Sequence, residues 1–160
     1  MRNKILYLLI YTLLASSCSK EKSVIVIIHP LQININGETS QLREQLKKRN
    51  TNLVYENSFE GEQSDVKLFY FDDESNNLHY HFEIYTLRDK IEGIIGSISS
   101  KYLSKNELYN KVESDILPKF KRSSNNLTNS LVRVEKGTER DNFGYYNFEI
   151  KTKELQEKLQ

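Results

Sequence analysis

The chain after residue 23 alternates apolar and polar positions over several stretches, a period typical of β-strands. Residues 24–28 are five apolar β-formers in a row, which predicts a buried strand. Residues 31–35 alternate strictly and end at the turn dipeptide Asn36-Gly37, which predicts a half-buried strand. The domain is therefore expected to open with two successive strands.

Two later regions have the composition of β-hairpins. Residues 65–71 and 78–85 are rich in aromatic and β-branched types, and the letters DDESNN between them favour a turn. Strands near 131–136 and 144–151 are expected to form a second hairpin around KGTERDN. A further strand is predicted at 52–56.

Helical spacing replaces alternation in two further segments. Thr39 or Ser40 is placed to cap a helix over residues 41–50, in which Leu42 and Leu46 stand one turn apart. The segment 86–102 begins with a capping-box-like pattern and continues with an apolar stripe at helical spacing, which predicts a second helix. The stripe consists of Leu87, Ile91, Ile94, Ile95, Ile98 and Tyr102.

The letters SKNE, from Ser104 to Glu107, form a capping box that opens a third helix. Pro118 is expected to end this helix, because proline lacks the amide hydrogen that a helix interior requires. Residues 153–160 predict a short fourth helix with Leu155 and Leu159 turned inward.

The predicted strands and helices follow one another without a regular βαβ rhythm. This order favours an α+β fold: a mainly antiparallel sheet of about five to seven strands, covered by three to four helices. Residues 23–160 are expected to form one such domain.

The first 17 residues have the three parts of a secretory leader. Arg2 and Lys4 supply positive charge, residues 5–15 are apolar except for Thr12, and residues 15–17 are small. A membrane-spanning helix needs about 20 apolar residues, so this run is too short to span a bilayer permanently. Residues 1–17 are therefore predicted to be a cleaved signal peptide.

Cys18, the only cysteine of the chain, follows the letters ASS directly. The segment resembles the lipobox of bacterial lipoproteins, with Ala15 where that family usually has leucine. The resemblance implies that the Cys18 thiol carries a diacylglyceryl group and that the new amino terminus is acylated, because two or three chains anchor a protein stably. The alternatives are a secreted protein with a free thiol and a cytosolic protein with an apolar first helix.

Residues 18–22 would then be a lipidated tether. Ser19 resembles the residue that releases enteric lipoproteins to the outer membrane, and the letters SKEK only partly match a surface-export signal. The expected location is the outer membrane of a bacterial envelope, with the leaflet left open. The five residues 19–23 reach about 17 Å, which would keep the domain near the bilayer.

Charge and missing motifs exclude several functions. Residues 18–160 hold 21 basic and 22 acidic side chains, whereas nucleic-acid binders carry an excess of positive charge. The sequence has no G-x-S-x-G, H-E-x-x-H, G-x-G-x-x-G or phosphate-binding loop. No nucleic-acid partner and no cofactor are therefore expected.

The letters LHYHFE place His79, His81 and Glu83 on one face of a strand. Two imidazoles and a carboxylate are ligands that zinc accepts, so these residues are the candidates for a metal site or for catalysis. The alternation also has a simpler reading, in which the apolar face packs and the polar face meets solvent. We expect no metal and, on balance, no enzyme.

Lys119, Lys121 and Arg122 form a basic group after the predicted end of the third helix. Positive charge is favoured there by the helix dipole, so a solvated patch explains the group. Contact with anionic lipid headgroups is the alternative, because the tether is short.

Taken together, the residues predict a membrane-anchored envelope lipoprotein that binds a protein or an envelope polymer without catalysis. Its partners would be the lipid bilayer, through acylated Cys18, and an envelope protein or glycan. The alternatives are a small metal-dependent hydrolase using His79, His81 and Glu83, an immunity-type inhibitor of an envelope toxin, and a purely structural envelope protein.

Overall fold

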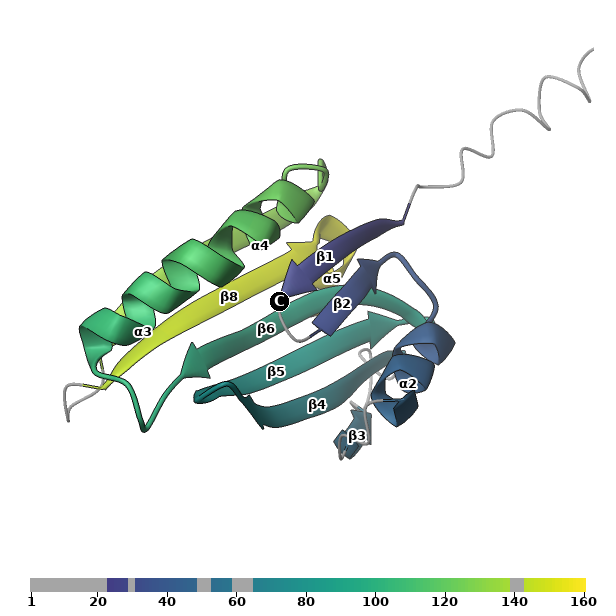
Figure 1. Cartoon of the computed structure of the whole chain (residues 1–160). Coiled ribbons are helices and arrows are strands. Elements are labelled where there is room, and N and C mark those ends of the chain that lie inside the picture. The colour runs from purple at the N-terminus through teal and green to yellow at the C-terminus, as the bar shows by residue number, and fades with distance from the viewer. Residues whose placement is uncertain (1–22, 29–30, 49–52, 59–64, 139–142) are drawn as a thin grey trace, which may run out of the picture.

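Successive hairpins build one antiparallel sheet, seen in a computed structural model that describes residues 23–28, 31–48, 53–58, 65–138 and 143–160 (Figure 1). The predicted leader, Cys18 and the tether lie outside the described residues. The sheet has six strands in the order β3-β4-β5-β6-β8-β7. Their bounds are Leu53–Ser58 for β3, Val66–Ser75 for β4, Leu78–Leu87 for β5, Lys90–Ser99 for β6, Ser130–Thr138 for β7 and Gly144–Thr152 for β8.

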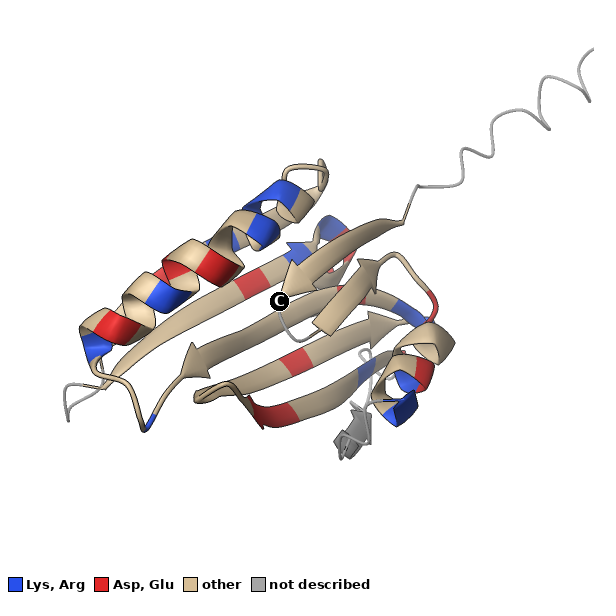
Figure 2. Cartoon of the chain, viewed as in Figure 1, with Lys and Arg blue, Asp and Glu red and all other residues tan. Residues whose placement is uncertain are grey.

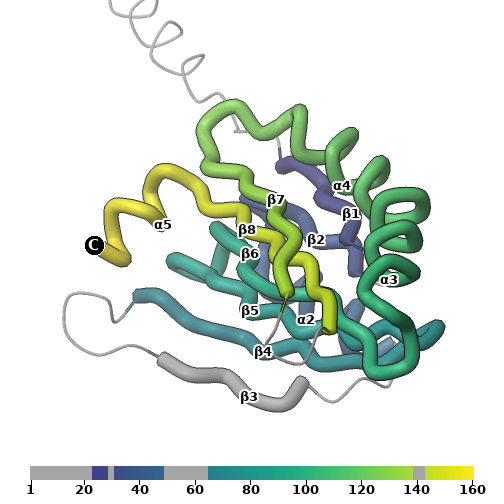
Figure 3. Tube along the Cα trace, turned by 90° about the vertical axis from the view of Figure 1, so that its left-hand side faces the viewer, coloured from purple at the N-terminus to yellow at the C-terminus, as the bar shows by residue number. Residues whose placement is uncertain are grey.

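A separate two-stranded hairpin lies across one face of this sheet (Figure 3). Strand β1, Val24–Ile28, pairs antiparallel with β2, Leu31–Ile35, so both predicted strands are present. The prediction that β1 is buried throughout is wrong: Val26 and Ile28 are buried, but Ile25 is 54% exposed, because successive side chains of a strand point to opposite faces. The Asn36 amide donates to the Ile91 carbonyl at 2.8 Å, and the Ile91 amide donates to the Gly37 carbonyl at 2.9 Å. These bonds attach the end of the hairpin to β6.

Three helical segments complete the fold. Helix α2, Thr39–Lys48, buries Leu42 and Leu46 as predicted. A long helix crosses the same face of the sheet as the hairpin; it consists of α3 Lys105–Lys111, a π-helical turn η2 Val112–Ile116, and α4 Leu117–Ser124. Helix α5, Lys153–Lys158, ends the chain on the other side of the sheet (Figure 3). The architecture is the α+β fold that the sequence predicts, with a mainly antiparallel sheet.

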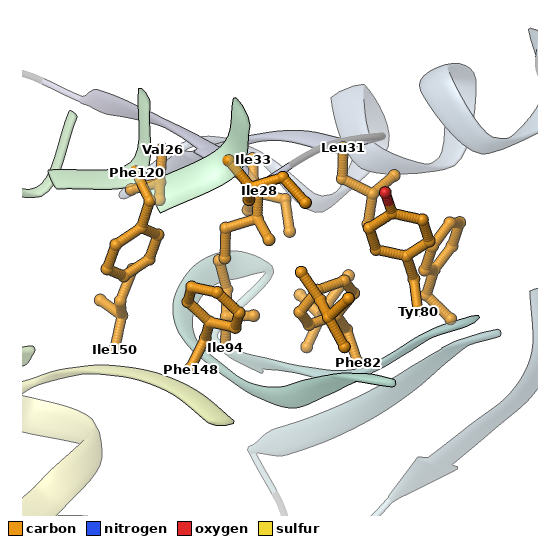
Figure 4. Packing of buried hydrophobic residues seen from close by; sticks show 14 of the residues in the cluster. Val26, Ile28, Leu31, Ile33, Tyr80, Phe82, Ile94, Phe120, Phe148 and Ile150 are labelled. Carbon is orange, nitrogen blue, oxygen red and sulfur yellow. The ribbon is translucent and has the colours of Figure 1, made fainter. Parts of the chain in front are cut away.

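The core fills the space between the sheet, the β1–β2 hairpin and the long helix (Figure 4). Val26, Ile28 and Ile33 come from the hairpin side, and Phe82, Ile94 and Ile150 rise from the sheet, all of them at most 1% exposed. The rings of Phe120 on α4 and Phe148 on β8 meet edge to face with centroids 5.0 Å apart. Each large side chain buried in this way contributes about 1.5–3 kcal/mol, so this layer supplies most of the stability.

The helix predicted for residues 86–102 is wrong: this segment is the strand β6. Arg88 and Asp89 both have positive φ, 50° and 63°, and form a two-residue turn that reverses the chain after β5. Because β6 lies in the middle of the sheet and carries a bulge, its buried positions do not alternate simply. The spacing of its apolar residues therefore matches the spacing expected on one face of a helix.

Pro118 does not end the third helix, contrary to the prediction. The π-helical turn shifts the hydrogen bonding before it: the Leu117 amide donates to the Val112 carbonyl, five residues back. The proline then occupies the first turn of α4, where an amide hydrogen is not required. The capping box of Ser104 and Glu107 is confirmed at the start of α3.

Gly96 gives a test that separates the two conformations of this segment. In a helix, Gly96→Ala would stabilise the protein by about 1 kcal/mol. In β6, an added Cβ would overlap the His81 carbonyl oxygen and the Phe82 ring. We expect Gly96→Ala to lower the free energy of unfolding by about 1–3 kcal/mol in urea denaturation. Ser97→Ala, one residue along the strand, should change it by less than about 0.5 kcal/mol; a stabilised Gly96→Ala protein would contradict the strand.

Candidate binding surface

Strand β5 alternates between buried and half-exposed side chains over nearly its whole length. Leu78, Tyr80, Phe82 and Ile84 are buried in the core, whereas His79, His81 and Glu83 point to the opposite side. The predicted separation of an apolar from a polar side of this strand is therefore confirmed. We call the side of the sheet that carries His79, His81 and Glu83 the open face.

The two histidines of the open face share one carboxylate. Nε2 of His79 lies 2.7 Å from Oδ1 of Asp72, and Nδ1 of His81 lies 3.1 Å from Oδ2 of the same side chain. Asp72 stands opposite His81 because β4 and β5 are joined by a two-residue turn at Asn76 and Asn77. The three side chains are 43–47% exposed, so solvent reaches the whole group.

This arrangement changes the acidity of Asp72. Partial burial acts to raise the pKa of the carboxyl, but hydrogen bonds and charge from His79 and His81 together lower the pKa below its ordinary value of 3.8. Asp72 is therefore ionised throughout the neutral range and serves as the acceptor for both rings. Because the pair is exposed, its contribution to stability is small.

Glu83 does not join the two histidines. Its carboxylate accepts a hydrogen bond of 2.8 Å from the Tyr85 hydroxyl, two residues along the same strand. Among the described residues, no group of three His, Cys, Asp or Glu side chains is arranged to hold a metal ion. The structure thus joins His79 and His81 through Asp72, and does not bring the set His79, His81 and Glu83 together.

A groove of about 390 Å³ runs across the middle of the open face. Strands β5, β6, β8 and β7 each contribute to it, because register places their side chains in rows: His81 faces Ser97, and Ser97 faces Asn147. Ile95 and Glu149 form the next row, which Arg133 of β7 continues. Polar and apolar surface line the groove about equally, and Ile95 is an apolar side chain within it.

The groove carries both signs of charge. Glu149 lies between two cations, with Lys151 Nζ at 2.9 Å and Arg133 Nη1 at 3.7 Å. Arg133 Nε is also 3.5 Å from Glu135. The Lys151 and Glu149 side chains are only about one-fifth exposed, whereas Arg133 is 56% exposed, so Arg133 is the cation that a partner can reach. Exchanging its long contacts for a partner costs little, because surface ion pairs contribute only about 0–1 kcal/mol each.

Two tyrosines of β5, one on each side of the strand, have raised pKa values. Burial, together with the hydrogen bond to Glu83, raises the pKa of Tyr85 well above its ordinary value of 10.0. Burial likewise raises the pKa of Tyr80, in the core, to about 12. Both hydroxyls stay protonated at neutral pH, and that of Tyr85 donates its proton to Glu83.

Helix α5 covers one end of the open face. Leu155 of α5 is fully buried against Val66 and Leu87, with Tyr85 and Leu159 packed around this small cluster. The inward positions predicted for Leu155 and Leu159 are confirmed by this packing. Helix α5 therefore closes the end of the open face near the β5–β6 turn and leaves the groove accessible.

Comparison of the chain with protein-family models, with curated proteins and with solved structures gives no match. Within the described part of the chain, no helix combines the length and the apolar character needed to cross a membrane.

Sequence reasoning missed several residues of this surface. Asp72 was assigned to a broad turn over the letters DDESNN. If only Asn76 and Asn77 form the turn, the two strands pair outward from it and Asp72 stands opposite His81, as observed. The groove includes Arg133, Asn147 and Glu149 only because β8 pairs with β6. In the sequence, the long helix separates these two strands. No local signal in the sequence indicates that pairing.

The shared carboxylate predicts how Asp72 titrates. In carboxyl NMR, its midpoint should lie below 3.8 in the wild-type protein and should move upward in His79→Ala/His81→Ala, because both hydrogen bonds and both charges are removed. Folding lowers the pKa of Asp72, so its contacts with the two histidines add to the free energy of unfolding. This contribution is present above the pKa that Asp72 has in the unfolded chain, and it is lost as pH falls through the pKa of the folded state. Ser97→Ala should leave the midpoint unchanged; an unchanged midpoint in the double variant would refute the pairing.

Proposed function

We propose that this protein is a membrane-anchored bacterial envelope lipoprotein that binds a partner through the open face and does not catalyse a reaction. The anchor is proposed from the lipobox resemblance of residues 1–18, with Cys18 as the acylated residue. The observation that carries the binding role is the bare groove on a sheet whose other face is buried by the hairpin and the long helix.

The chemistry of the groove favours a protein as the partner. In one row across the open face stand Glu83 of β5, Ile95 of β6, Glu149 of β8 and Arg133 of β7. The lining holds the carboxylates of Glu83, Glu135 and Glu149 beside the apolar Ile95, and a protein surface can supply both cations and apolar contact at defined spacing, whereas a neutral glycan supplies no cations.

The geometry gives less support to a metal-dependent hydrolase. His79 and His81 already share Asp72, and Glu83 is held by Tyr85. A zinc site for hydrolysis needs three converging protein ligands and an open fourth position, usually within a concave pocket. The exposed sheet face suits contact with a second surface better than it suits such a site.

Site-specific photocrosslinking in the native envelope tests the proposal. A photoreactive residue replaces Asn147, which is exposed and lines the groove. We expect ultraviolet light to join the protein to one partner in the membrane fraction. We also expect Cys18→Ser to release the unacylated protein from that fraction, because the acyl chains are the proposed anchor.

The matched control places the same photoreactive residue at Asn110, an exposed asparagine of α3 on the helical side. This position should give no comparable product. Equal crosslinking from Asn110 and Asn147 would contradict a binding role for the open face. Membrane retention of the Cys18→Ser protein would contradict the anchor separately.

A further inference from the structure

Charge is sorted along the long helix that covers the sheet (Figure 2). The π-helical turn carries Glu113 and Asp115, whereas α4 carries Lys119, Lys121 and Arg122 and no acidic residue. The described loop that follows α4, residues 125–129, has no charged residue. The helix therefore ends in a purely basic segment, which we call the basic end of α4.

The cations of this basic end have no close ion pair with a described residue, although the charge of Lys121 helps to lower the pKa of Glu113. Lys119, Lys121 and Arg122 are all exposed, and within the described chain no carboxylate lies within 4.0 Å of their charged nitrogens. By contrast, Lys136 lies 3.1 Å from Glu113. The positive charge at the end of α4 is thus available to an anionic surface.

The basic end of α4 lies where the chain enters the domain (Figure 1). Helix α4 packs along β1, and a cavity of about 1150 Å³ is lined both by Val24 and Ile25 and by Asn126 and Leu127. Ile25 is 54% exposed at this site, which is unusual for an isoleucine next to the core. The start of β1 and the end of α4 therefore form one corner of the molecule.

This corner would be held against the bilayer by the proposed anchor. Residues 19–23 separate Cys18 from β1 and reach at most about 17 Å. An anionic membrane surface attracts cations within about 8 Å at physiological salt. The tether sets only an upper limit on separation, so a segment at the same corner can come within this range of the headgroups.

We propose that the basic end of α4 docks onto anionic phospholipid headgroups of the bilayer that holds the acyl chains. The inference rests on the proposed anchor for its location, and on the charge and exposure of α4 for its chemistry. The tether keeps the domain close, and the basic end of α4 fixes which side faces the membrane.

Docking at this corner sets the orientation of the open face. The β4–β5 turn and the start of α3 lie at the opposite end of the molecule from the start of β1 (Figure 1). The strands of the sheet then run away from the bilayer, and the groove on the open face stays exposed to a partner. Membrane docking and partner binding would use different sides of one rigid layer.

Vesicle binding tests the inference without depending on acylation. The probe is the mature chain, residues 18–160, with Cys18→Ser, mixed with vesicles of phosphatidylglycerol and phosphatidylcholine or of phosphatidylcholine alone. We expect binding only to the anionic vesicles, and loss of binding as salt is raised. Lys121→Glu/Arg122→Glu should weaken binding by about 25-fold or more, because each cation contributes about fivefold.

Helix α2 offers a closely matched control. Lys47→Glu/Lys48→Glu also reverses two exposed cations in the last turn of a helix, so its effects on net charge and on the helix dipole are the same. This variant should weaken vesicle binding by less than about threefold, because α2 lies on the opposite side of the β1–β2 hairpin from α4 (Figure 1). Thermal unfolding of both variants verifies that they remain folded.

Several outcomes would overturn the inference. Equal weakening by the two variants would assign binding to net charge alone, and equal binding to both kinds of vesicle would assign it to apolar contact. The milder Lys121→Gln/Arg122→Gln should give an intermediate loss; no loss would also contradict docking. Because the probe carries no acyl chain, these results are independent of whether Cys18 is acylated in the cell.

Discussion

The structure depends on the packing of two different covers, a β-hairpin and a long helix, on one face of a six-stranded sheet. Phe120 of α4 and Phe148 of β8 meet within this layer, on the side where Val26 also lies (Figure 4). A core of this kind is built from apolar area rather than from crosslinks, since the chain has only Cys18. Because both covers lie on the same side, the opposite side is left with a groove that α5 closes only at one end.

The fold could be predicted wherever one local signal was sufficient. Alternation over residues 31–35 and the capping box at Ser104 both led to the observed elements. The error at β6 had a physical cause. This central strand is partly buried on both faces, and its bulge interrupts the alternation with a period of two. Its isoleucines therefore fall at positions that also fit one face of a helix. The error at Pro118 arose because a π-helical turn changed the hydrogen bonding before it.

The candidate surface was predictable only along its own strand. His79, His81 and Glu83 were placed together by the alternation of β5, but which carboxylate would meet the histidines depended on the turn at Asn76. The rest of the groove comes from β6, β8 and β7, which a long helix separates in sequence. Pairing between such distant strands follows from core packing as a whole, so residue patterns alone do not indicate it.

A cysteine scan along β5 tests most directly whether one side of the sheet is buried and the other open. In a Cys18→Ser background the chain has no other thiol, so each single cysteine introduced at positions 79–84 reports the accessibility of its own position. The account predicts rapid maleimide labelling at 79, 81 and 83, and labelling at 80, 82 and 84 only after unfolding. Protection of 79, 81 and 83 in the purified folded protein would show that the open face is covered, and would contradict the account.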